Sequence, residues 1–71
     1  LGLRSVMFVL LKVDPKNLAS VVEKLKEFPF IVEVHEVTGD YQLLAKIAAP
    51  THGEAARAVE ELTTVEGVRD Y

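Results

Sequence analysis

A turn in the middle of the chain limits the folds that the sequence can adopt. Thr38-Gly39-Asp40 separates two runs of β-branched and other apolar residues, 30–37 and 41–48. Glycine supplies the positive φ that a tight turn requires, and apolar runs on both sides of such a turn are typical of a β-hairpin. The sequence therefore predicts two antiparallel strands joined at Gly39.

A two-residue turn at Gly39-Asp40 also fixes which side chains share a face. Counting outward from it places Glu33 directly across from Lys46, an opposite-charge pair that favours this register. One face should be wholly apolar and should meet the helices, with Phe30, Val32, Val34, Tyr41, Leu43, Ala45 and Ile47. The other face is mixed, with Ile31, Glu33, His35, Val37, Gln42, Leu44, Lys46 and Ala48.

The residues before the hairpin predict a strand and a helix. Ser5–Val13 is rich in β-branched and large apolar residues, with no polar alternation before Lys12, which is the pattern of a central strand. Asp14-Pro15 indicates a helix start, since aspartate caps a first turn and proline suits its first position. Apolar residues recur at helical spacing as far as about Glu27, and Pro29 ends the helix.

The residues after the hairpin predict a second helix and a fourth strand. Thr51 and Glu54 match a capping box at the start of the helix, and residues 68–71 begin the strand. The helix should bury a narrow stripe of Ala55, Ala56, Val59 and Leu62. This order indicates an α+β protein of the ferredoxin-like βαββαβ type. Right-handed crossovers then place two helices on one face of a four-stranded antiparallel sheet.

The second face of that sheet has no helix to cover it. Because Lys12 should point to solvent, alternate residues of its strand share its side of the sheet, while Met7, Val9 and Leu11 turn toward the helices. The exposed side then carries an open-face patch of Val6, Phe8, Leu10 and Leu44. A domain of 71 residues has a small core, so we expect two copies to dimerise by face-to-face packing of their sheets. An apolar surface without a partner is the alternative.

Composition narrows the classes of function. The net charge of −3 argues against direct binding to the phosphate backbone of nucleic acids. The absence of cysteine excludes disulfides, thiolate metal sites and a cysteine nucleophile. The longest apolar run, Val6–Leu11, is far shorter than the ~20 residues of a membrane span. We expect a cytoplasmic protein that binds neither a membrane nor a cofactor.

Residues able to perform chemistry do not converge in the sequence. His35 and His52 have no partners at the spacing of a metal site, although His35 shares a strand face with Glu33. No serine lies in a nucleophile motif, and no glycine-rich phosphate loop is present. We therefore expect no enzymatic activity.

The hairpin resembles the signature of a known family. The leucine-responsive regulatory protein (Lrp/AsnC) family has a hairpin of the form valine-threonine-glycine-acid-aromatic-aspartate before aliphatic residues, which is similar to Val34-His35-Glu36-Val37-Thr38-Gly39-Asp40-Tyr41-Gln42-Leu43-Leu44-Ala45-Lys46. The family's turn before its last strand resembles Val65-Glu66-Gly67-Val68, and its interdomain linker resembles Leu1-Gly2-Leu3. Nearly the whole chain then corresponds to the C-terminal effector domain called RAM, for regulation of amino acid metabolism.

The resemblance implies a transcription regulator whose contact with DNA is made by a helix-turn-helix domain upstream of this chain. It also implies dimers formed by stacked sheets, octamers or similar rings of those dimers, and a small molecule such as an amino acid bound between dimers. The effector-binding positions would be Thr38, Gly39, Asp40, Tyr41 and Gln42, with Thr63 and Thr64 of a neighbouring copy. Gln42 stands where the family usually has aspartate, so a neutral amide replaces the carboxylate expected to hold the ligand's ammonium group.

Other proteins of this fold class fit the same pattern. The chain starts at Leu1 without an initiator methionine, so we expect a fragment of a longer protein, but a free-standing RAM domain spanning residues 1–71 also fits. An ACT-type amino-acid sensor would pair its sheets edge to edge. A small dimeric α/β-barrel enzyme, such as a monooxygenase, would need a pocket between helices and sheet. We expect that space to be filled by Phe28, Phe30, Leu43 and Ile47.

Overall fold

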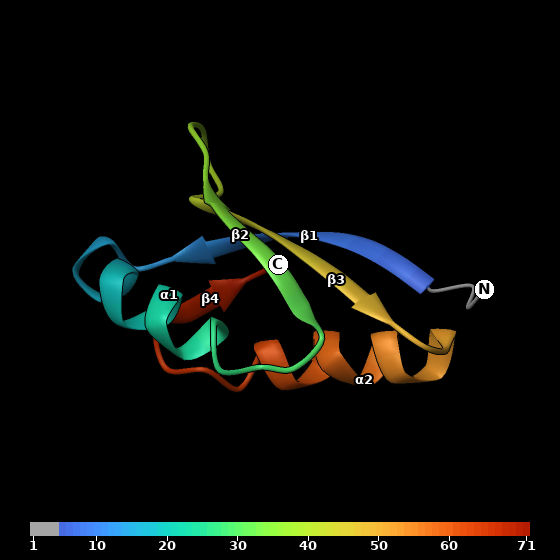
Figure 1. Ribbon diagram of the computed structural model, residues 1–71. Helices are drawn as coiled ribbons and strands as arrows, with labels where there is room; N and C mark the ends of the chain where they lie inside the picture. The colour runs from blue at the N-terminus through green and yellow to red at the C-terminus, as the bar shows by residue number, and fades with distance from the viewer. Residues whose placement is uncertain (1–4) are drawn as a thin grey trace.

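The computed structural model describes residues 5–71 and has the expected order of elements (Figure 1). The strands are β1 (Ser5–Val13), β2 (Ile31–Glu36), β3 (Leu43–Ala49) and β4 (Val68–Asp70), and the helices are α1 (Leu18–Leu25) and α2 (His52–Leu62). The antiparallel sheet has the order β2-β3-β1-β4, and both helices lie on one side of it. The ferredoxin-like α+β fold is thus confirmed. The linker-like Leu1-Gly2-Leu3 lies outside the described residues.

Strand β1 is central, as the sequence predicted, because it lies between β3 and β4. Its alternation directs Val9 and Leu11 toward the helices, where they are cross-strand partners of Ala45 and Leu43. The core between the sheet and the helices consists of Val9, Leu11, Val13, Val21, Leu25, Leu43, Ala45, Ile47, Ala49, Ala55, Ala58 and Leu62. Burial is therefore confined to one face of β1. The sequence predicted a strand covered on both faces, and the second face would be covered only by a partner that packs on it.

The first helical segment has two parts. A short 3-10 helix (Pro15–Asn17) is capped by Asp14, whose carboxylate accepts a hydrogen bond from the Lys16 N–H at 3.3 Å. The regular helix α1 follows it and ends at Leu25, earlier than the predicted end near Glu27. The N–H groups of Glu27 and the residue after it bond to carbonyl oxygens three residues earlier, which tightens the last turn and ends the α-helical pattern.

A β-bulge alters the predicted register at the start of β2. The pairing is as predicted from Glu33, opposite Lys46, to the end of the strand, but a register shift lies between Ile31 and Glu33. One extra residue reverses the alternation before it. Ile31 therefore pairs with Ile47 and packs on the core, whereas Val32 is 48% exposed. The predicted faces of Ile31 and Val32 were wrong for this reason.

Helix α2 begins where the capping motif placed it. The Glu54 N–H donates to the Thr51 hydroxyl oxygen at 3.1 Å. The buried stripe consists of Ala55, Ala58 and Leu62. Ala56 is exposed, so its prediction was wrong, and Ala58 takes its place because it lies one turn before Leu62. No helix within residues 5–71 is long and apolar enough to cross a membrane.

Candidate functional site: the hairpin turn and the open sheet face

The hairpin turn is an open loop at the end of β2 and β3. Gly39 has φ +116°, which confirms the positive φ predicted for it. The last backbone bond of the hairpin runs from Val37 N–H to the Gln42 carbonyl oxygen at 2.9 Å. The backbone N–H groups of residues 38–41 donate no hydrogen bond to any described residue. The turn projects away from the layer of helices (Figure 1), and residues 38–40 are exposed in the single chain.

Gln42 connects the base of the hairpin to the end of β1. Its side-chain oxygen accepts a hydrogen bond from the Val13 N–H at 2.8 Å, and its side-chain nitrogen donates to the Asp40 carbonyl oxygen at 3.1 Å. Its own N–H donates to the Leu11 carbonyl oxygen at 3.0 Å. The amide at the family's aspartate position is therefore already engaged within the chain. No sequence pattern indicated this role, since Val13 lies 29 residues before Gln42 in the chain.

The other predicted ligand-binding residues are divided between two regions. The Tyr41 hydroxyl donates to the Asp70 carboxylate at 3.5 Å, which places the aromatic ring against β4. The hydroxyls of Thr63 and Thr64 donate to carbonyl oxygens in the last turn of α2, at 2.6 and 2.7 Å. They lie in the helical layer, whereas the hairpin turn points to the opposite side of the sheet (Figure 1). The two regions thus do not meet within one chain.

The open-face patch is exposed as the alternation of β1 predicted. Phe8 is 64% exposed, Val6 49% and Leu10 47%. Leu44 is half-buried and is the cross-strand partner of Leu10. These side chains lie on the two central strands, on the face of the sheet that the helices leave uncovered.

Three charged or titratable side chains adjoin this patch. The Glu33 carboxylate contacts His35 Nε2 at 2.8 Å and Lys46 Nζ at 3.2 Å. The hydrogen bond with His35, followed by the interaction with Lys46, holds the pKa of Glu33 below its usual value. The sequence predicted the pairing of Glu33 with Lys46, and it also placed His35 on the same face. The direct contact between His35 and Glu33 was not anticipated.

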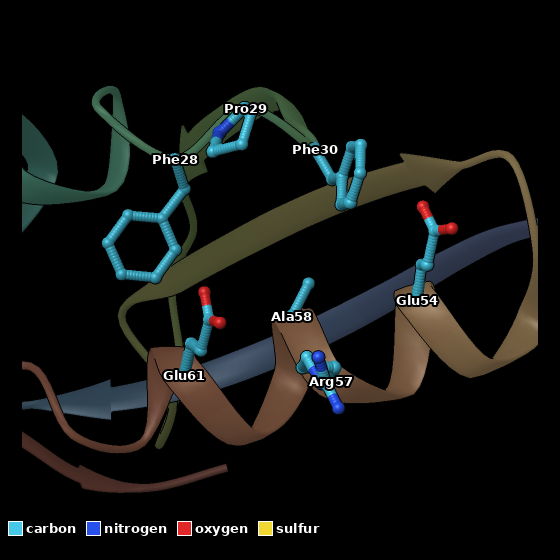
Figure 2. A pocket seen from close by; sticks show the side chains of 7 residues that line it. All are labelled: Phe28, Pro29, Phe30, Glu54, Arg57, Ala58 and Glu61. Carbon is cyan, nitrogen blue, oxygen red and sulfur yellow. The ribbon is translucent and has the colours of Figure 1, made fainter.

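One hollow on the helical side lies outside the core. A groove of about 340 Å³ runs between α2 and the loop that precedes β2, and Figure 2 shows Phe28 and Phe30 across from Glu54 and Glu61. Between the helices and the sheet, Leu43 and Ile47 are fully buried and the two phenylalanines pack against the same cluster. The described residues contain no group of three or more histidine and acidic side chains arranged to hold a metal ion.

The chain is similar in sequence to one known family and to several individual proteins. Residues 6–71 match the Lrp/AsnC ligand binding domain. Over 68 residues the chain is 37% identical to the HTH-type transcriptional regulator FL11 of Pyrococcus furiosus and 34% identical to that of Pyrococcus horikoshii. An uncharacterised HTH-type transcriptional regulator of Pyrococcus furiosus is 33% identical over 72 residues.

These matches cover 96% of the chain but only 45% to 48% of the three relatives, so the chain spans about half their length. The relatives are named as HTH-type transcriptional regulators. The match of residues 6–71 includes the hairpin, the open sheet face and both helices. The chain belongs to the Lrp/AsnC family and corresponds to its ligand-binding domain.

Proposed function

We propose that the chain is the ligand-sensing and oligomerisation module of a cytoplasmic Lrp/AsnC-type transcription regulator. Two copies dimerise through the open-face patch, and dimers assemble further with a small molecule such as an amino acid bound between them. DNA is contacted by a domain upstream of this chain. The exposed patch carries the proposal, because an apolar surface of this kind on a small domain favours association.

Burial of Phe8 would make a large contribution to the dimer. The side chain is 64% exposed in the single chain, and full burial of a phenylalanine contributes about 1.5–3 kcal/mol relative to exposure. In a face-to-face dimer related by a two-fold axis, the same residue is buried on each copy. Leu10 and Val6, each about half exposed, add to the surface on both sides.

The hairpin turn suits the carboxylate of an amino acid. Consecutive backbone N–H groups without partners form a concave anion site when a turn orients them together, and residues 38–41 provide such groups. Asp40 is the carboxylate nearest in sequence to receive the ammonium group, since the Gln42 amide is engaged with β1 and with the Asp40 carbonyl oxygen. Thr63 and Thr64 of a neighbouring copy complete the proposed site with hydroxyl oxygens that remain able to accept hydrogen bonds.

Two measurements test the proposal. Analytical ultracentrifugation should show the native chain as a dimer or larger assembly and Phe8→Glu as a folded monomer, because the substitution places an unpaired charge in the interface. Ala56→Glu, at an exposed position of α2 on the other side of the sheet, is the control and should leave the dimer intact. Calorimetric titration with a panel of amino acids should give binding that is lost in Asp40→Ala. An intact Phe8→Glu dimer would exclude this interface, and unchanged titration of Asp40→Ala would exclude the hairpin site.

A further inference from the structure

The charged groups on the open sheet face form one cluster with the apolar patch. Glu33 of β2 lies between two basic side chains, with contacts of 2.8 Å to His35 and 3.2 Å to Lys46. The Lys46 ammonium lies 5.9 Å from the centroid of the Phe8 ring, and His35 is the cross-strand partner of Leu44. Any partner that covers Phe8 and Leu44 therefore also removes water from this cluster.

We propose that this cluster makes dimerisation depend on pH, with protonation of His35 separating the two sheets. The inference rests on the proposed dimer interface and adds a regulatory property to it.

The net charge of the cluster links the protonation of His35 to the stability of the dimer. With His35 neutral, the charges of Lys46 and Glu33 cancel and the cluster has no net charge. Protonation of His35 gives each face a net charge of +1, and stacking two such faces brings like charges together. Removing uncompensated charge from water is unfavourable, and a monomer with an open face avoids this cost. Two monomers then bind more protons than the dimer, so dimer stability rises with pH and falls on acidification.

Glu33 is the neighbour of His35 whose charge the contacts of the cluster hold in place. Histidine is the side chain whose charge ordinarily changes between pH 5 and 8, whereas carboxylates and ammonium groups ordinarily do not change. The pKa of Glu33 is held below its usual value by His35 and Lys46, so this carboxylate stays ionised. Lys12 of β1 faces Asp70 of β4 at the far end of the sheet. These two opposite charges lie outside the cluster and offset each other.

The remaining histidine provides an internal control. His52 begins α2, and its Nδ1 atom lies 3.4 Å from the Ser5 hydroxyl. The helix packs on the opposite side of the sheet from the open-face patch (Figure 1), so its protonation adds no charge to the proposed interface. His52→Gln should therefore keep the pH dependence of the native chain.

The test is the dimer dissociation constant measured by sedimentation from pH 8 to pH 5.5 at constant ionic strength. For the native chain it should rise by about tenfold or more, since a pKa difference of one unit between monomer and dimer corresponds to a factor of ten for each histidine. His35→Gln, which keeps a side-chain hydrogen-bond donor, should give a nearly constant value. Lys46→Met should reverse the trend, because His35 protonation then neutralises Glu33 instead of adding net charge.

The possible results distinguish a failure of the pH dependence from a failure of the proposed dimer interface. A native chain that dimerises, is disrupted by Phe8→Glu, and has the same dissociation constant at both pH values would overturn the pH switch alone. A chain that is monomeric at every pH, or whose dimer tolerates Phe8→Glu, would overturn the interface and the switch together. A pH dependence that persists in His35→Gln, or that is not reversed in Lys46→Met, would also overturn the switch. Circular dichroism of each variant confirms that it is folded.

Discussion

Gly67 and Gly39 provide a matched test of how closely the last turn packs on α1. Both glycines have positive φ, +102° and +116°, a region that other residues adopt at a cost. They differ in their surroundings. A Cβ atom at Gly39 would meet nothing within 4 Å, whereas one at Gly67 would lie 2.7 Å from Asn17 Cβ and 2.9 Å from Val21 Cγ2. Alanine at each position therefore separates backbone strain from steric overlap.

The two variants should lose different amounts of stability, because only Gly67→Ala adds steric overlap to the backbone strain. Gly39→Ala should lower the free energy of unfolding by roughly 1–2 kcal/mol through backbone strain. Gly67→Ala incurs a similar strain and adds overpacking of about 1–3 kcal/mol, because Val21 is fully buried and has little room to move. The Gly67 carbonyl oxygen also accepts a hydrogen bond from the Asp14 N–H at 3.1 Å, so displacement of the turn would disturb the start of the first helical segment.

Urea unfolding followed by circular dichroism measures both losses. The native chain and the two variants are compared at one protein concentration and one pH, since association contributes to apparent stability. Gly67→Ala should unfold at a clearly lower urea concentration than Gly39→Ala. Equal midpoints, or a lower midpoint for Gly39→Ala, would refute the close approach of Gly67 to α1.

Two further substitutions test the elements that position the site, both by thermal unfolding at fixed concentration. Thr51→Ala removes the hydroxyl that accepts the Glu54 N–H and should cost about 1 kcal/mol, and a melting temperature unchanged from the native value would contradict the cap. Leu25→Ala leaves a cavity in the core and should cost about 2–5 kcal/mol, whereas Val32→Ala at the exposed bulge should cost far less. Similar losses for Leu25→Ala and Val32→Ala would show that the bulge buries Val32 after all.

The sequence predicted the fold because its signals were local and agreed with one another. Gly39, the capping residue Thr51 and the alternation of β1 each acted over a few residues, and all indicated the same arrangement. The bulge in β2 was not predictable in this way. Phe30, Ile31 and Val32 are consecutive and all apolar, so either phase of the alternation places an apolar side chain on the core. Only packing against β3 selects Ile31.

The candidate site was less predictable because its contacts join distant segments. The exposed patch followed from alternation along β1 alone, and the pairing of Glu33 with Lys46 followed from counting outward from Gly39. The Gln42 amide bonds to a backbone N–H at the end of another strand. Sequence patterns describe side chains, so they do not indicate which backbone group a side chain contacts. The departure from the family's aspartate therefore looked like the loss of a ligand contact, whereas the structure adds a bond to β1.

Gln42 both bonds to β1 and lies in the proposed ligand site, so Gln42→Asp should destabilise the fold and strengthen ligand binding. Aspartate is one methylene shorter and does not reach as glutamine does, so the part-buried Val13 N–H loses its partner and unfolding should become easier by about 1–3 kcal/mol. The same change supplies a carboxylate for the ammonium group of an amino acid, and affinity should rise about tenfold, equivalent to about 1.4 kcal/mol.

Gln42→Asn is the matched control, since it shortens the side chain equally without adding charge. Thermal unfolding should show similar losses for both variants, while calorimetric titration should show stronger binding for Gln42→Asp alone. Equal affinities of the two variants would show that a carboxylate at position 42 does not reach the ammonium group, which Asp40 then holds alone.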